Sequence, residues 1–143
     1  MRTILLILIG LSVVAQAERF TRDATTEIVT DTQTNLQWQD DEDAKTTELD
    51  WASAITHCED LDFGGETDWR LPNFNELYYI ADRSIYNPAL SSVFVNVVSR
   101  DYWSSTTDAS GTSRAWVVYF YGGYDLNDDK GTSYFVRCVR AGQ

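Results

Sequence analysis

The sequence predicts an α+β fold, because segments typical of strands lie at both ends of the chain and two segments typical of helices lie between them. Strands and helices do not alternate, so a parallel βαβ arrangement is not expected. Of the 143 residues, 43% are hydrophobic and 13% are aromatic, which is enough for one packed core. A chain of this length without repeats or a linker-like stretch predicts one domain, which we place at residues 18–143.

Residues 1–17 predict a signal peptide that is removed on export. Arg2 supplies a positive charge ahead of the apolar run Ile4–Val14, which is shorter than the roughly 20 residues that span a bilayer. Ala15–Ala17 then matches the small-x-small pattern of a signal-peptidase site. A short buried helix is the alternative. We expect a periplasmic or extracellular product without membrane insertion, because no second apolar stretch approaches membrane length.

The segment after the leader favours short strands joined by turns. Glu27–Thr30 and Leu36–Trp38 are rich in β-branched and aromatic residues, and the turn-forming residues Asp31–Asn35 separate them. Asp40–Asp43 follows as an acidic run, which we expect on a solvated loop.

Glu48–Leu61 predicts the first helix. Trp51, Ile55, Cys58 and Leu61 recur at helical spacing and form one apolar stripe. Cys58 should therefore face the core.

A second helix is predicted to begin after Asn73 and to end near Asp82. Asn73 can cap this helix, and Glu76 can return a hydrogen bond to the cap backbone. We interpret Arg70 and Glu76 as an ion pair that fixes the loop before the helix. A catalytic acid or a ligand clamp is the alternative for these two residues.

The last third of the chain predicts three strands, at Tyr102–Thr106, Ala115–Tyr121 and Ser133–Arg140. Asp108–Ser113 and Gly122–Gly131 are interpreted as polar connections between them. Large aromatic side chains dominate burial, so four tryptophans are assigned to the core: Trp51, Trp69, Trp103 and Trp116.

The two cysteines, Cys58 and Cys138, would most simply form one disulfide in an oxidising compartment. Chain-entropy estimates give such a bond about 4–5 kcal/mol of stabilisation as an upper figure. A free nucleophile or a metal site is the alternative. A nucleophile would need a base, and His57, the single histidine, points about 100° away from its neighbour on a helix.

Three ordered motifs resemble one known family. Asp68–Leu77, Tyr102–Thr106 and Tyr134–Arg140 resemble the C-terminal domain family of the Legionella collagen-like adhesin, over nearly all of the chain after the leader. The resemblance implies a C-type lectin-like fold with two helices and a mainly antiparallel sheet. In that fold a disulfide commonly joins the first helix to the last strand, where Cys58 and Cys138 lie. Trp69, Arg70, Asn73 and Glu76 are then residues of the structural motif.

The negative charge of the chain does not suit the anionic ligands of the best-known member of that family. The best-known member binds sulfated polysaccharides, whereas this chain has 11 Lys and Arg against 22 Asp and Glu, a net charge of −11. Such a charge disfavours nucleic acid, anionic membranes and polyanionic sugars. The sequence leaves open whether the basic residues gather in one local patch.

Tyr119–Asp125 is the segment that most favours ligand binding. Strand alternation cannot bury Tyr119, Phe120 and Tyr121 on one face, so some rings should be exposed beside carboxylates. Exposed rings beside hydrogen-bonding acids suit a sugar or a protein partner. Packing against a neighbouring loop is the alternative. The candidate ligand-binding residues are Tyr121, Tyr124, Asp125 and Asn127.

Calcium is the one cofactor to consider, at Asp125, Asn127 and Asp129. These residues match the first three alternating positions of a calcium loop. Lys130 stands where such a loop needs glycine, and Val136 stands where it needs glutamate. We therefore expect a solvated turn and no resident cofactor or metal. The Glu-Pro-Asn and Trp-Asn-Asp signatures of calcium-dependent lectins are absent.

The sequence therefore predicts an exported, non-enzymatic binding module. It lacks HExxH, GxSxG and phosphate-loop motifs, so no catalytic residues are assigned. The expected ligand is a carbohydrate or a cell-surface protein, bound by aromatic and acidic loops. The alternatives are a structural or protein-interaction component of the cell envelope and a hydrolase on the same scaffold.

Overall fold

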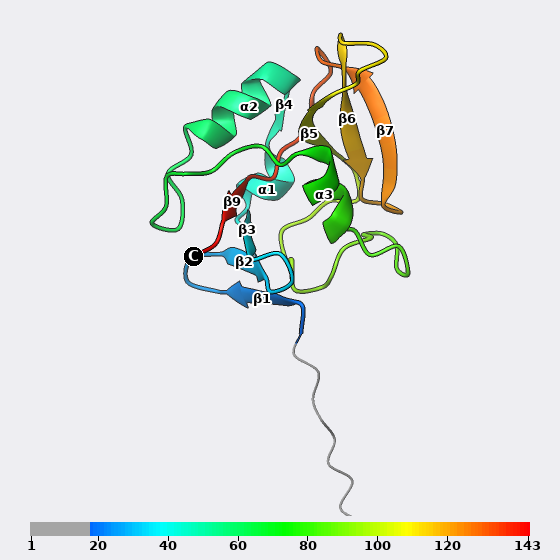
Figure 1. Ribbon diagram of the computed structural model, residues 1–143. Helices are drawn as coiled ribbons and strands as arrows, with labels where there is room; N and C mark the ends of the chain where they lie inside the picture. The colour runs from blue at the N-terminus through cyan, green and yellow to red at the C-terminus, as the bar shows by residue number, and fades with distance from the viewer. Residues whose placement is uncertain (1–17) are drawn as a thin grey trace, which may run out of the picture.

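The computed structural model describes residues 18–143, so the predicted signal peptide lies outside the described residues. Two sheets and three helices form an α+β fold of the C-type lectin-like kind, which confirms the predicted fold class (Figure 1). The helices are α1 (Asp43–Thr46), α2 (Trp51–Glu59) and α3 (Phe74–Ile80). Within residues 18–143, none of them has the length and apolar character to cross a membrane.

The first sheet joins the two ends of the described chain. Its antiparallel strands follow the order β1-β2-β3-β9. The strand β9 adds to β3 with Val139 opposite Trp38, so the last strand closes the sheet that the first strands begin. The bounds are β1 Phe20–Asp23, β2 Ile28–Asp31, β3 Leu36–Gln39 and β9 Val139–Ala141.

The second sheet has the order β4-β8-β5-β6-β7, and only the β5–β8 pair is parallel. In Figure 1, β6 and β7 form the right-hand edge of the molecule, with the long connection from α3 to β5 below them. The strand β7 has a neighbour on one side only. The bounds are β4 Glu48–Leu49, β5 Asp101–Thr107, β6 Arg114–Tyr119, β7 Tyr124–Asp129 and β8 Tyr134–Phe135.

Local signals in the sequence explain where the longer helices begin. The Asp50 carboxylate accepts a hydrogen bond from the Ser53 backbone N–H and caps α2. At α3, Asn73 and Glu76 form both bonds of a capping box, as the sequence predicts. The Arg70 guanidinium donates to both carboxylate oxygens of Glu76 at 2.7 Å, so a fixed ion pair precedes the helix.

The predicted disulfide is present. Cys58 in α2 is bonded to Cys138, which lies directly before β9, and both residues are fully buried. The bond joins the helix to the segment that passes from the second sheet to the first. Neither cysteine is a free nucleophile.

The acidic run Asp40–Asp43 is not simply a solvated loop, as the sequence led us to expect. The Asp40 carboxylate is fully buried and accepts from Arg22 at 2.6 Å and from Arg137 at 3.0 Å. It also accepts from the backbone N–H groups of Val95 and Asn96. Asp40 is therefore an internal anion that ties the long connection before β5 to the first sheet.

Other boundaries differ from the prediction. The first helix begins at Trp51, because Glu48 and Leu49 pair with β8 instead of starting the helix. The last predicted strand divides into β8 and β9, which belong to different sheets. The connection predicted at residues 122–131 contains the strand β7, and residues 43–46 form the unpredicted helix α1. Of the four assigned core tryptophans, Trp69 and Trp103 are buried, whereas Trp51 and Trp116 are half-buried.

Candidate functional site

Four tyrosines gather around the turn between β6 and β7. The rings of Tyr119 and Tyr121 are stacked with centroids 5.9 Å apart, and the ring of Tyr86 lies 6.1 Å from that of Tyr121. Tyr124 begins β7 directly opposite Tyr119. The exposed fractions are 73% for Tyr86, 42% for Tyr121 and 62% for Tyr124, so these rings face solvent. We call Tyr86, Tyr119, Tyr121 and Tyr124 the tyrosine platform.

Backbone hydrogen bonds hold the two halves of the platform together. The Asn87 N–H donates to the Tyr121 carbonyl, and the Ala89 N–H donates to the Phe120 carbonyl, both at 2.7 Å. Phe120 itself is buried and packs edge-on against Tyr102. The buried Phe120 anchors the segment while its neighbours point outward, which is the alternation that the sequence predicts for this strand end.

Gly123 makes the tight turn of the platform possible. Its φ of +78° is a conformation that favours glycine. A Cβ at this position would lie 3.1 Å from Cγ of Arg83 and 3.3 Å from Cβ of Ala81. The turn therefore packs closely on the chain that follows α3, and a side chain here would push the two apart.

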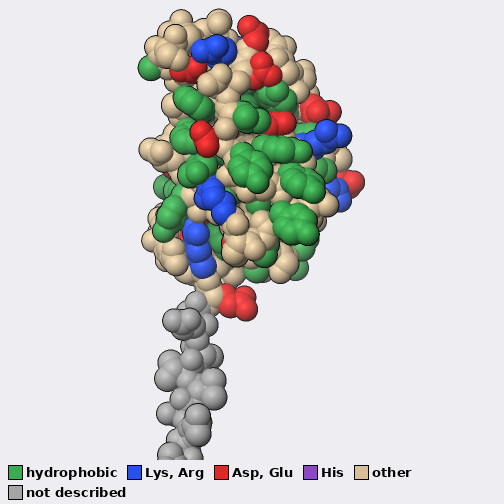
Figure 2. All heavy atoms as spheres, turned by 90° about the vertical axis from the view of Figure 1, so that its right-hand side faces the viewer, with side chains coloured by type: hydrophobic (Ala, Val, Ile, Leu, Met, Phe, Trp, Pro, Cys, Tyr) green, Lys and Arg blue, Asp and Glu red, His purple; other side chains and the backbone are tan. Residues whose placement is uncertain are grey.

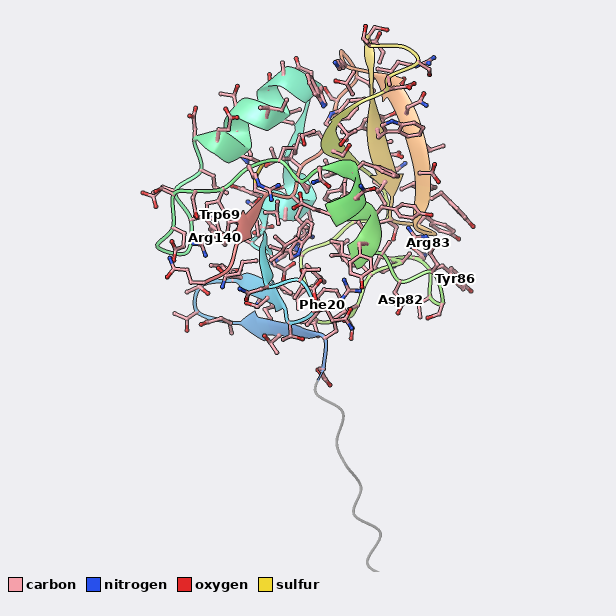
Figure 3. All side chains as sticks on the ribbon, viewed as in Figure 1. Phe20, Trp69, Asp82, Arg83, Tyr86 and Arg140 are labelled. Atoms are coloured by element: carbon pink, nitrogen blue, oxygen red, sulfur yellow. A yellow bond between two sulfur atoms is a disulfide. The ribbon has the colours of Figure 1, made fainter. Side chains whose placement is uncertain are left out.

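Arg83 also links the β6–β7 turn to the chain that follows α3. Its Nε donates to the Gly123 carbonyl and its Nη2 to the Tyr78 carbonyl, both at 3.0 Å. Its guanidinium also lies 3.5 Å from the centre of the Tyr78 ring. Figure 3 shows Asp82, Arg83 and Tyr86 close together at the lower right of the molecule. Arg83 is thus a positioning residue whose donors are already used within the protein.

Asp82 and Arg83 also line a cavity of about 500 Å³. Its lining mixes apolar side chains, such as Phe20 and Val93, with the hydroxyl groups of Ser91 and Ser92. Six of its ten lining residues are polar or charged, so it lacks the mostly apolar walls that are typical of small-ligand sites. Arg19 also lines this cavity, but its guanidinium is committed to the Asp31 carboxylate at 2.7 Å.

The comparison with known families gives one match. The family model described as the Lcl C-terminal domain matches residues 27–140. The chain belongs to this family. This confirms the family that the three sequence motifs resemble. Lcl C-terminal domains are adhesin-like binding modules and are not known as enzymes. No curated protein is significantly similar to the chain.

The residues that mark this chain as an Lcl C-terminal domain build its scaffold. Trp69 is buried, and the backbones of Arg70 and Val139 exchange two hydrogen bonds of 2.9 Å. Arg140 donates to the Asp68 carboxylate at 2.6 Å. Figure 3 shows Trp69 and Arg140 together, on the opposite side of the molecule from Tyr86. None of the platform tyrosines lies within a motif, so the family match does not identify the ligand of the platform.

The structure brings together only part of the predicted ligand-binding set in this Lcl domain. Tyr121 and Tyr124 belong to the platform. Asp125 and Asn127 lie in β7, opposite Val118 and Trp116, and therefore on the other face of the sheet from Tyr124. The prediction placed Tyr124, Asp125 and Asn127 in a connection, which is wrong because all three lie in β7, and it placed Tyr121 at the end of a strand, whereas Tyr121 lies in the turn after β6. Tyr86 was missed, although its position beside the turn formers Asn87 and Pro88 was a signal for an exposed ring.

The three calcium candidates lie in an extended strand and not in a turn. Asp125, Asn127 and Asp129 occupy alternate positions of β7, about 6.6 Å apart along the strand. Oxygen atoms spaced in this way do not wrap around one ion. Within residues 18–143, no group of three or more His, Cys, Asp and Glu side chains is placed to hold a metal ion.

A hydrogen-bonded acid lies at the far end of β7. The Tyr134 hydroxyl donates to the Asp128 carboxylate at 2.5 Å and lowers the pKa of Asp128. Burial, followed by this hydrogen bond, raises the pKa of Tyr134. Burial also raises the pKa of Asp101. Asp101 also lies directly opposite Tyr119 of the platform in the β5–β6 pair.

Figure 2 shows the face that carries β7 and the loop after α3. Hydrophobic side chains gather across the middle of this face, with acidic and basic side chains around them. The exposed large hydrophobic residues of these segments are Ile85, Tyr86, Tyr121, Tyr124 and Leu126. An exposed apolar cluster with a polar rim is typical of an interaction surface.

Proposed function

We propose that this domain is an exported binding module that recognises a polysaccharide by stacking sugar rings on the tyrosine platform. The observation that carries the proposal is the row of rings formed by Tyr86, Tyr121 and Tyr119, of which Tyr86 and Tyr121 are exposed and Tyr119 is half-buried. Tyrosine offers an apolar face for the C–H groups of a sugar and a hydroxyl for its O–H groups.

The rigidity of the platform supports this function. Two backbone hydrogen bonds, the buried Phe120 and the contacts of Gly123 hold the backbone that carries the rings in place before any ligand arrives. A site that is already ordered loses less conformational entropy on binding, so weak stacking contacts give more affinity. The platform itself is built from tyrosines on a fixed turn, an arrangement that suits binding without turnover.

Export is the second part of the proposal. The predicted leader precedes the domain, and the Cys58–Cys138 disulfide is of the kind that persists in oxidising compartments. We expect mass spectrometry of the native protein to find a chain that begins at Glu18 with no free thiol. A retained leader in a cytosolic pool would contradict this part alone.

Alanine substitution tests the platform. Tyr121→Ala and Tyr86→Ala should each weaken polysaccharide binding about tenfold, the loss expected for a central aromatic contact. Tyr79→Ala is the matched control, because Tyr79 is 53% exposed but belongs to α3 and lies outside the platform. Binding is measured by affinity electrophoresis in gels that contain soluble polysaccharides, and unfolding in urea verifies that each variant is folded.

Two results would contradict the proposal. Equal losses in Tyr79→Ala and Tyr121→Ala would show that the effect is not local to the platform. A platform that binds no polysaccharide but retains a protein from the cell envelope would favour the interaction-component alternative.

A further inference from the structure

We infer that the ligand of the platform is an uncharged polysaccharide and that sulfated chains are excluded. This inference rests on the proposed function and adds the chemical class of the ligand. The inference follows from the contacts that the basic side chains of residues 18–143 make. These contacts show whether the basic residues gather in one patch, which the sequence left open.

Most of the cations are paired with carboxylates of the protein itself. Ten basic residues follow the leader, and six of the eight arginines form ion pairs with carboxylates at 2.6–3.0 Å. The carboxylate partner offsets the charge of each paired arginine, so such a pair attracts a sulfate group only weakly. The six are Arg19, Arg22, Arg70, Arg114, Arg137 and Arg140.

Two of the other four, Arg83 and Arg100, lie beside the segment that carries the platform. Arg83 donates to backbone carbonyls, and Lys130 donates to the Thr107 hydroxyl while lying 4.0 Å from the centre of the Trp51 ring. Within the described part of the chain, Lys45 and Arg100 make no side-chain hydrogen bond or ion pair. Arg100 lines a cavity together with the carboxylates of Glu48 and Asp101, so its surroundings are also acidic.

Carboxylates stand beside the platform instead. Asp82 is exposed at the start of the loop that carries Tyr86, and Asp101 lies in β5 directly opposite Tyr119. The Ser84 N–H and hydroxyl both bind Oδ1 of Asp82, and no residue of the described chain donates to its Oδ2. A sugar hydroxyl can donate to this free oxygen, whereas a sulfate group would be repelled by it.

Matched polysaccharide pairs test the inference. Dextran, mannan and hydroxyethyl cellulose, each with its sulfated derivative, are cast into affinity gels at low and at moderate salt. We expect at least one neutral polymer to bind, and we expect sulfation to weaken that binding at least tenfold at low salt. Added salt should reduce the difference, because it screens the repulsion. Tyr121→Ala should weaken the neutral binding about tenfold, as proposed above.

The outcomes separate the inference from the proposed function. Sulfated polymers that bind as well as or better than their neutral partners, through Tyr121, would overturn the inference and leave the proposed function standing. Binding of no polymer at all would overturn both.

A charge reversal gives a second test. Asp82→Lys should raise affinity for the sulfated polymers about fivefold at low salt, because it replaces the exposed carboxylate on the loop of Tyr86 with a cation. Asp62→Lys changes the net charge equally but lies in the loop after α2, where it is exposed and makes no side-chain hydrogen bond within residues 18–143. An equal gain in both variants would show that net charge alone, and not the platform's surroundings, excludes sulfated chains.

Discussion

The platform depends on the backbone conformation of single residues as much as on the side chains that would contact a ligand. The tyrosines supply the surface, but Gly123 allows the turn to approach Arg83 and Ala81 closely. The same residue also adopts a positive φ, which β-carbon sterics disfavour. Stacking geometry therefore depends on a residue that has no side chain to offer a ligand.

Gly123→Ala should cost more stability than the backbone conformation alone explains. The positive φ predicts a loss of about 1–2 kcal/mol, and the crowding against Arg83 adds about 1 kcal/mol more. Gly65→Ala is the matched control, because Gly65 has a φ of +80° but a Cβ added there would have no atom within 4 Å. Urea unfolding of both variants measures the difference. Equal losses would show that the close approach at the turn is unimportant.

The start of α3 shows how polar residues can stabilise a secondary-structure element. The capping box and ion pair at α3 combine Asn73, Glu76 and Arg70 into one fixed helix start. Burial tends to raise the pKa of Glu76, but the hydrogen bonds from Arg70 and from the Asn73 N–H outweigh it and hold this pKa below the ordinary value of 4.5. The carboxylate thus stabilises the fold in its charged form.

Glu76→Gln should destabilise the protein in a pH-dependent way. Because the folded pKa lies below the unfolded one, the contribution of Glu76 is complete above about pH 4.5 and is lost as the pH falls through the lowered value. We expect a loss of about 1–2 kcal/mol at pH 7 that shrinks in acid. Glu59→Gln, an exposed change on α2, should cost nothing comparable. A deficit that is constant from pH 7 to pH 3 would rule out the charged pair as its source.

Sequence patterns predicted the elements whose signals are local. The helix caps and the exposed rings beside Phe120 follow from spacing and residue type alone. The strand β7 was missed because Asp125 and Asp129 are poor strand formers, and only pairing with β6 makes that segment extended. Asp40 was misplaced for a similar reason. Its partner Arg137 is 97 residues away, so no local pattern reveals the buried pair.

In the whole molecule, the residues that build the scaffold and the residues of the proposed binding surface lie on opposite sides. The residues that identify the family fasten the segment around Trp69 to the last strand, while the platform occupies the opposite side. The Cys58–Cys138 bond belongs to the scaffold side, where it joins α2 to the crossing between the two sheets. Stability and recognition should therefore respond to different substitutions.

Removal of the disulfide tests this division. Replacement of Cys58 and Cys138 together by alanine should cost about 2–5 kcal/mol, because the unfolded chain gains freedom over the long loop that the bond closes. Urea unfolding and thermal melting measure this loss. Below the unfolding transition, polysaccharide binding should stay within about twofold of the native value, because the platform is held by its own backbone bonds.

The native bond should also resist reduction. Both sulfurs belong to fully buried residues, so a thiol reductant reaches them only when the structure opens. Mass spectrometry after treatment with dithiothreitol should show an intact bond without denaturant and rapid reduction with it. Fast reduction of the folded protein would mean that the scaffold opens locally at the crossing between the sheets.

The double alanine variant gives the second possible contradiction. If this variant is folded but no longer binds, the platform depends on the disulfide, and the two sides of the molecule are not independent.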